Sequence, residues 1–172
     1  TGVAVRAMLV FTVVLGVGYM LLITAVGQLA FPAQANGSLV RAGDGSVVGS
    51  ALIAQSFQDA DGEALPQYFQ SRPSAADYDA AASSGSNLGP ENADLVAAIE
   101  ERRAASLRLD GPGEIPADAV TASGSGLDPD ISVADAKRQA ARVAEVRGIP
   151  VSEVEVLVDA RVIGRDLGYL GE

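Results

Sequence analysis

The apolar segment from Ala7 to Phe31 holds no charged residue, and it constrains the chain more than any other feature. At about 1.5 Å per residue, a helix over this stretch reaches about 37 Å, whereas the hydrocarbon core of a bilayer is roughly 30 Å thick. Its glycines at positions 16, 18 and 27 weaken a helix in water but are tolerated in membrane spans. The sequence therefore predicts a transmembrane helix over residues 7–31.

A cleaved secretory signal peptide is the alternative for this segment. Ala33-Gln34-Ala35 fits the small-x-small cleavage pattern, but a signal peptide has an apolar region of only about 7–15 residues. Either interpretation sends the rest of the chain across the membrane. Arg6 precedes the span and no other Lys or Arg occurs before Arg41, so the positive-inside rule predicts a cytoplasmic N-terminus.

Small residues lie one helical turn apart within the predicted span, at Thr12 and Gly16. Such a pair allows another helix to approach closely, and the alternative is a lone span that faces lipid. The span holds no charged residue, which argues against ion transport through this helix itself.

Composition excludes several classes of function. The net charge of −10 argues against nucleic-acid binding, because it repels the phosphate backbone. It would attract cations over a screening length of about 8 Å, and the alternative is that it serves solubility alone. The chain has no cysteine and no histidine, so it lacks disulfides, thiolate metal sites and the commonest general base.

Residues 35–172 are predicted to form one extracytoplasmic α+β domain. Asp44-Gly45 lies between β-branched residues and indicates a β-hairpin over 38–49. Residues 51–57 either continue the second strand or form a helical turn. Residues 58–91 show no periodicity and are expected to form a long loop anchored by aromatic residues. These anchors are Tyr68, Phe69 and Tyr78.

Three helices are predicted after the loop, each from a capping residue. Asn92 begins a helix to about Leu107, Ser132 begins a second with Asp135 as an acidic capping-box partner, and Ser152 begins a third to about Ala160. The second helix is expected to end at Gly148. Its inward face is expected to hold Val133, Ala136, Ala140, Val143 and Ala144.

The glycine-rich segment 121–130 admits several interpretations. Its glycines could let backbone amides cradle a phosphate, although the acidic Asp128 and Asp130 would repel one. Ser123 or Ser125 could act as a nucleophile activated by Lys137, as in a serine hydrolase. Asp128, Asp130 and loop carbonyls could bind a hard cation. A turn-rich connector, or a surface that contacts a partner, is the simpler interpretation.

Two further loop segments join this one as candidate partner-contact surfaces. Leu88-Gly89-Pro90 before a capped helix favours an ordered turn that carries Ser86 and Asn87, and Arg72-Pro73-Ser74 places a guanidinium in a rigid loop. No catalytic, cofactor-binding or metal-binding residue is assigned. The candidate functional residues are Arg72, Ser74, Ser86, Asn87, Ser123, Ser125, Asp128 and Asp130, with Thr12 and Gly16 as helix contacts.

Seven short motifs recur here in the order found in one known family. They are FPAQANGSL at 31–39, GSALIAQ at 49–55, YF at 68–69, RPSA at 72–75, GSNL at 85–88, TASGSGLD at 121–128 and RVA at 142–144. On these motifs the chain resembles the KdpC family of the Kdp potassium-transporting P-type ATPase, from about Gly16 to Gly171. Each motif alone is weak, but their order across a span-plus-domain layout is specific.

The resemblance implies an accessory, non-catalytic subunit in the cell membrane, needed for assembly and activity of an ATP-driven potassium importer. Its partners would be the channel-like KdpA, the ATPase component KdpB and the small KdpF, and the complex would use ATP and potassium. A role as a catalytic chaperone that raises the ATP affinity of KdpB conflicts with a domain outside the cytoplasm. A cap over the potassium entrance of KdpA agrees better with that sidedness.

The sequence departs from the family at three places. Gln70-Ser71 replaces a frequent His-Gly, Met20 replaces a frequent proline, and an apolar final strand expected past Gly171 is missing, which would leave a sheet edge unpaired.

From a different functional class, a membrane-anchored extracytoplasmic protein that binds a cation or small solute is the second hypothesis.

Overall fold

The computed structural model describes residues 1–165 and 167–169, and the chain forms two compact units, Thr1–Leu52 and Ile53–Glu172. This division lies later than residue 35, where the sequence predicts the extracytoplasmic domain to begin. A boundary between packed units and a boundary at a membrane surface are different properties, so the domain limits 35–172 stay a prediction. The expected final strand past Gly171 lies outside the described residues.

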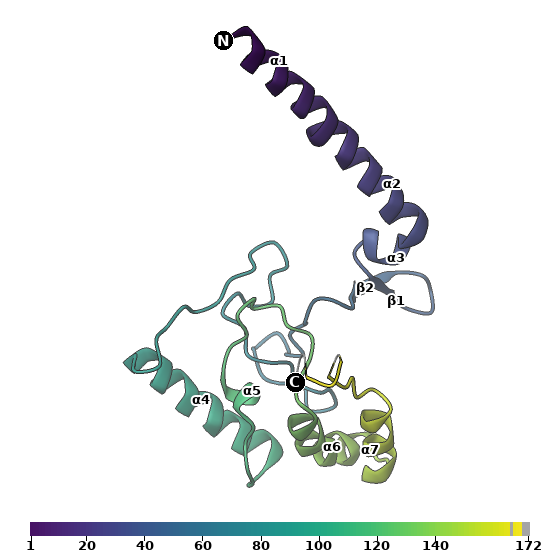
Figure 1. Ribbon diagram of the computed structural model, residues 1–172. Coiled ribbons are helices and arrows are strands. Elements are labelled where there is room, and N and C mark those ends of the chain that lie inside the picture. The colour runs from purple at the N-terminus through teal and green to yellow at the C-terminus, as the bar shows by residue number, and fades with distance from the viewer. Residues whose placement is uncertain (166, 170–172) are drawn as a thin grey trace. The chain divides into compact units, whose positions relative to one another are not determined.

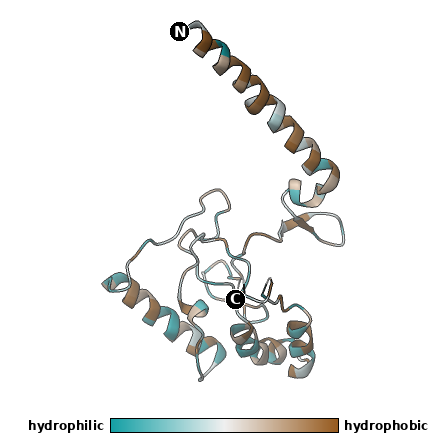
Figure 2. Ribbon diagram, in the orientation of Figure 1, coloured by the Kyte–Doolittle hydropathy of each residue, from teal (hydrophilic) through white to brown (hydrophobic). Residues whose placement is uncertain are grey.

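The first unit begins with a long helix that consists of α1 (Gly2–Phe11), a π-helical stretch η1 (Thr12–Tyr19) and α2 (Met20–Ala30). These segments follow one another as a single rod (Figure 1), and apolar residues cover the rod along its length (Figure 2). None of its residues is buried by the rest of the chain. This helix, Gly2–Ala30, is long and apolar enough to cross a membrane. The limits of the membrane span itself, 7–31, stay a prediction.

After the rod, the chain folds back and forms a hairpin. The short helix α3 (Pro32–Ala35) begins with proline, which fits the first turn of a helix because that turn needs no amide donor. Strands β1 (Leu39–Arg41) and β2 (Val47–Ser50) then pair antiparallel, with Val40 opposite Gly49 and a bulge between Val40 and Arg41. The predicted hairpin around Asp44-Gly45 is confirmed.

The second unit begins with a long irregular segment, as the sequence predicts. From Ile53 to Asn92 it contains turns and a single isolated bridge between Gln58 and Ala64, and residues 51–57 form neither the longer strand nor a helix. Four helices follow. They are α4 (Ala93–Asp110), α5 (Ala117–Val120), α6 (Val133–Arg147) and α7 (Val151–Asp159).

Two of the three predicted helix starts are confirmed. The side chain of Asn92 accepts hydrogen bonds from the amides of Asp94 and Leu95, and Ser132 Oγ accepts one from the Asp135 amide. The third prediction is wrong, because Pro150, not Ser152, lies at the N-cap of α7 and the helix begins at Val151. Proline is tolerated there because its amide nitrogen has no intrahelical partner to lose.

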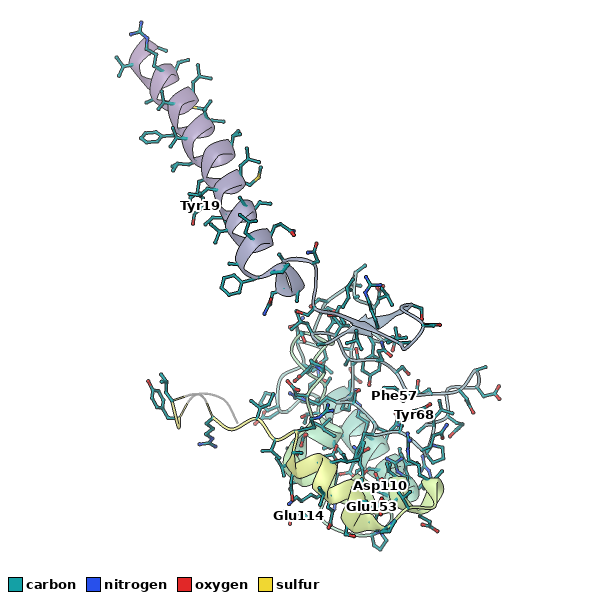
Figure 3. The ribbon with its side chains drawn as sticks, turned by 90° about the vertical axis from the view of Figure 1, so that its right-hand side faces the viewer. Tyr19, Phe57, Tyr68, Asp110, Glu114 and Glu153 are labelled. Atoms are coloured by element: carbon teal, nitrogen blue, oxygen red, sulfur yellow. The ribbon has the colours of Figure 1, made fainter. Side chains whose placement is uncertain are left out.

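The apolar core of the second unit is small. Ala140, Val143 and Ala144 of α6 pack with Val154 of α7, and Phe69 from the irregular segment packs against them. Val133 is exposed, so its predicted inward position is wrong. Beside the core, the rings of Phe57 and Tyr68 stack with centroids 5.2 Å apart (Figure 3). Three of the four core side chains are alanine or valine on one helix, so other contacts must hold the long irregular segment in place.

Candidate functional site

Three segments distant in sequence meet in what we call the three-loop junction, formed by residues 72–76, 83–85 and 123–128. The Ser123 amide donates to the Pro73 carbonyl at 3.1 Å, and Ser74 Oγ donates to the Gly126 carbonyl at 2.7 Å. From the second loop, the amide of Ser84 and the hydroxyl of Ser83 both donate to the Ser125 carbonyl. The glycine-rich segment is thus the central member, to which both other loops bond.

Two glycines allow this close approach. A Cβ on Gly126 would lie 2.7 Å from the Ser84 carbonyl oxygen and 2.9 Å from Ala76 Cβ, and Gly126 also has a φ of +68°. A Cβ on Gly85 would lie 2.9 Å from the Gly124 carbonyl oxygen. Side chains at these positions would push the loops apart, which explains glycine here without any bound ligand.

An ion pair joins the first loop to the end of the junction. Arg72 Nη1 lies 2.9 Å from Asp128 Oδ2, and both side chains are about a quarter exposed. The carbonyl of Arg72 also accepts a hydrogen bond from the Tyr78 hydroxyl at 2.9 Å, and burial raises the pKa of Tyr78 above its usual value. The hydroxyl of Tyr78 therefore anchors the loop, in agreement with the predicted anchoring role of this residue.

The cation-site interpretation finds little support in this arrangement. Asp128 faces the Arg72 guanidinium, and its other oxygen accepts the amide of Asp130 at 3.1 Å. Within residues 1–165 and 167–169, no cluster of three or more carboxylates could hold a metal ion. Asp130 is exposed at the surface.

The junction also gives the serines structural partners. Ser123 is only 3% exposed, and its Oγ lies 3.5 Å from Ser125 Oγ. Lys137, the only lysine, lies 3.0 Å from Asp159 and so pairs with α7. The amides of Ser123, Gly126 and Leu127 bond to oxygens of the protein itself, which removes them as donors to a phosphate.

The remaining candidates lie apart from these contacts. Ser86 and Asn87 are exposed, and the Asn87 side-chain amide donates to the Gly85 carbonyl at 3.2 Å. In the rod, a Cβ on Gly16 would lie 3.9 Å from Thr12 Cγ2, so these two residues share one face of the helix. That face remains available for another helix.

A buried polar network, which the sequence did not reveal, holds the irregular segment against α6. Arg142 is 8% exposed, and its Nε lies 2.7 Å from Asp110 Oδ1 at the end of α4. The same guanidinium donates to the carbonyls of Pro66 and Tyr68 and to Gln139 Oε1. One arginine on α6 thereby fixes both a distant helix end and a loop.

Gln139 extends the network to the next loop residues. Its side chain accepts from the Gln70 amide at 2.7 Å and donates to the Gln70 carbonyl at 3.1 Å, so the pair resembles one rung of a sheet. Arg138 adds a second contact to Asp110 at 3.0 Å and donates to the Gly111 carbonyl. These residues hold the stretch of chain that leads directly into the first loop of the junction.

An unusual carboxyl group lies at the start of α6. Asp135 is buried and accepts a hydrogen bond from Gln139 Nε2 at 2.7 Å. Burial, together with the charges of Asp118 and Asp110, raises the pKa of Asp135 to about 6, against the opposing effects of Gln139 and Arg138. One of the two hydrogen bonds of the predicted capping box is present, since the Asp135 amide donates to Ser132 Oγ. The reciprocal bond is absent, because the Ser132 amide donates to Asp118 and not to Asp135.

Taken together, the junction is a tightly bonded surface of loops. Its serines Ser123 and Ser125 lie beside each other, whereas Lys137 pairs with Asp159. What the arrangement offers chemically is a rigid set of exposed loop groups next to a paired arginine and aspartate.

Comparison with known proteins places this chain beside one family. The family model described as the K+-transporting ATPase c chain, KdpC, matches residues 1–172. The chain is 56% identical over 172 residues to the potassium-transporting ATPase KdpC subunit of Caulobacter vibrioides (strain NA1000 / CB15N), covering 98% of this chain and 84% of that protein. It is 52% identical over 174 residues to the protein of that name from Mycobacterium tuberculosis (strain ATCC 25618 / H37Rv), covering 98% and 88%.

Proposed function

Because the chain belongs to the KdpC family, the c chains of K+-transporting ATPases, we propose that it is a non-catalytic accessory subunit of an ATP-driven potassium pump. Its long apolar helix would hold it in the membrane. Its second unit would contact other components of the pump from outside the cytoplasm. The expected partners are the channel-like KdpA, the ATPase component KdpB and the small KdpF.

The helix Gly2–Ala30 is the observation that carries this proposal. Its large apolar side chains are about half exposed or more, and none of its residues is buried. Exposing that much apolar surface to water is costly, at roughly 25 cal/mol for each Å². A bilayer removes this cost, and a helix of this length exceeds the ~20 residues needed to span it.

The proposed sidedness follows from charge. Arg6 near the start of the helix is the only charged residue before Arg41, which favours a cytoplasmic N-terminus. The second unit then lies on the side from which potassium enters. Contact with cytoplasmic ATP would require the opposite orientation, so we favour a role in assembly and in covering the potassium entrance over a role in ATP binding.

The three-loop junction is the proposed partner-contact surface of the second unit. Its hydrogen bonds and the Arg72–Asp128 pair hold it rigid. A rigid surface loses little conformational entropy on binding, which favours association. Ser86 and Asn87 lie exposed beside it and would make direct contacts.

Copurification tests membership of the complex. An affinity tag on this chain is expected to retain large polytopic subunits in mild detergent, in constant ratio through size-exclusion chromatography. A chain that is recovered alone under conditions where tagged KdpB retains KdpA would overturn the proposal. That result would favour a membrane-anchored solute-binding protein instead.

Sidedness can be tested cleanly because the chain has no cysteine. Thr1→Cys and Asp61→Cys place single thiols before the rod and in an exposed turn of the second unit. A membrane-impermeant maleimide on intact cells should label Asp61→Cys at once and Thr1→Cys only after lysis. The reverse pattern would place the second unit in the cytoplasm.

A further inference from the structure

We propose that residues Phe31–Leu52, the fold-back helix α3 and the β-hairpin together, bind the lipid headgroup region of the bilayer surface. The inference rests on the proposed function in one respect, since it requires the rod to span the membrane. It adds a second membrane contact made by a segment that the transmembrane helix does not include.

The first step is the fold-back itself. The side-chain amide of Asn36 donates to Gln28 Oε1 at 3.1 Å, and it also donates to the Pro32 carbonyl. A Cβ on Gly27 would lie 3.7 Å from Ala35 Cβ. The chain therefore leaves the rod at Phe31 and returns beside its last turn, so that Asn36 lies level with Gln28.

The second step is depth. With Arg6 at the inner boundary of the hydrocarbon core, the ~20 residues that cross the core end near Val26. Gly27 to Ala30 then lie in the outer headgroup region, which is about 5 to 8 Å thick on each side. Since α3 returns along these residues, it lies at headgroup depth, and β1 begins three residues after Asn36.

The hairpin is tied to this position. Ser50 Oγ donates to the Gly37 carbonyl at 2.7 Å, and the Ala51 amide donates to the Ser38 carbonyl at 3.0 Å. The end of β2 is thus attached to Gly37 and Ser38, from which β1 continues directly. Hairpin and rod belong to the same compact unit, so the hairpin remains close to the end of the rod.

The third step is the apolar surface of the hairpin. Leu39 and Val47 lie on one face and Val40 on the other, and these side chains are 44–50% exposed. A two-stranded hairpin with apolar groups on both faces is marginally stable in water and needs a surface to cover it. Phe31 and Leu52 extend the exposed apolar surface at either end.

Charge favours lipid as that surface. All but one of the 22 acidic residues lie after residue 52, and the first unit carries Arg6, Arg41 and only Asp44 in opposition. Anionic headgroups would repel the second unit but not the hairpin, because the charges of Arg41 and Asp44 cancel. The charge of the segment next to the span therefore permits close contact with headgroups.

The test uses single cysteines that carry an environment-sensitive fluorophore in the full-length chain. The positions are Val40 and Val47 on the hairpin, Leu15 within the rod and Asp61 in the second unit. Each variant is placed in vesicles of phosphatidylcholine and phosphatidylglycerol that contain lipid with a nitroxide either near the headgroup or near the acyl-chain end. The readouts are the emission maximum of the fluorophore and the quenching of its fluorescence by each nitroxide lipid.

A blue shift at Val40 or Val47, with quenching by the headgroup-level nitroxide and none at Asp61, supports the proposal. Labels at Val40 and Val47 that both behave like Asp61 overturn it. If reconstitution with the other pump components abolishes the lipid quenching while the emission stays blue-shifted, a protein covers the hairpin and the proposal is also wrong. The label at Leu15 must be quenched by the acyl-chain nitroxide. If it is not, the transmembrane placement is wrong and the proposed function fails with it. Quenching at Leu15 without quenching at the hairpin overturns only the lipid-binding proposal.

Discussion

Arg142 Nε lies 2.7 Å from Asp110 Oδ1 and so joins the middle of helix α6 to the end of helix α4. Asp110 Oδ2 lies 3.0 Å from Arg138 Nη1, so one buried carboxylate serves two guanidinium groups. Through its contacts to the Pro66 and Tyr68 carbonyls, Arg142 also fixes the irregular segment. The second unit, with its small apolar core, thus depends on charged side chains for its tertiary structure.

Replacing Arg142 should therefore destabilise the second unit strongly. Arg142→Met leaves Asp110 with Arg138 as its one ion-pair partner, and it removes the donor to the carbonyls of Pro66 and Tyr68. Breaking a buried ion pair typically costs about 3–5 kcal/mol of stability. Urea unfolding of the full chain in detergent, followed by circular dichroism, measures the change. Lys137→Met is the matched control, since its pair with Asp159 is about half exposed and should change the free energy of unfolding by about 1 kcal/mol or less. Equal effects of the two substitutions would contradict the network's role.

Gly126 should tolerate no side chain, whereas its neighbour Gly124 should. Gly126→Ala puts a Cβ 2.7 Å from the Ser84 carbonyl oxygen at a φ of +68°, so it should lower the free energy of unfolding by about 1–3 kcal/mol. A Cβ on Gly124 meets nothing within 4 Å. Thermal unfolding of both variants is the measurement. If Gly124→Ala proves as harmful as Gly126→Ala, close approach of the loops is not the reason for glycine in this segment.

Local signals in the sequence predicted the features that depend on a few neighbouring residues. Asn92 and Ser132 cap their helices because a short polar side chain reaches amides two or three residues ahead. Asp44-Gly45 turns the hairpin for the same local reason. The prediction that Ser152 begins the last helix is wrong, because Pro150, two residues earlier, already fixes a backbone conformation that begins a helix.

Long-range polar pairs could not be predicted in the same way. Arg142 and Asp110 are 32 residues apart, and Arg72 and Asp128 are 56 apart, so nothing in the local pattern links them. An arginine on an amphipathic helix usually indicates an exposed face, because lone charges are rarely buried. The glycine-rich loop stands out in the sequence as a group of candidate residues, but their common role in bonding to residues 72–76 and 83–85 required the fold.

Stability of the second unit should depend on pH through Asp135. Its pKa is about 6 in the folded chain and near 3.8 when the chain unfolds, so the folded state binds the proton more tightly. The free energy of unfolding should therefore fall as pH rises from about 4 to about 6, by at most about 3 kcal/mol, and level off above. Asp135→Asn should remove this slope and stabilise the chain at pH 7.5 while changing little at pH 4.

A charge-matched control separates this effect from general electrostatics. Asp61→Asn removes the same charge from an exposed turn, so it tests whether lowering the net negative charge alone stabilises the chain. The midpoint of thermal unfolding for all three proteins, measured between pH 4 and 8, gives the comparison. Parallel curves for the chain and Asp135→Asn would show that this carboxyl does not couple to folding.

The proposed position over a potassium entrance predicts an effect on potassium affinity. Replacing Asp128 and Asp130 by Asn should raise the potassium concentration for half-maximal ATPase activity of the assembled pump, because an acidic surface concentrates cations locally. Asp130→Asn alone should produce most of this rise, since Asp128 is already paired with Arg72 while Asp130 is exposed. Added choline chloride should reduce the difference, because screening shortens the reach of a surface charge to about 3 Å at 1 M salt. Asp61→Asn, in an exposed turn of the same unit, is the control. A half-maximal potassium concentration unchanged by both Asn substitutions would show that these carboxylates do not act on the ion.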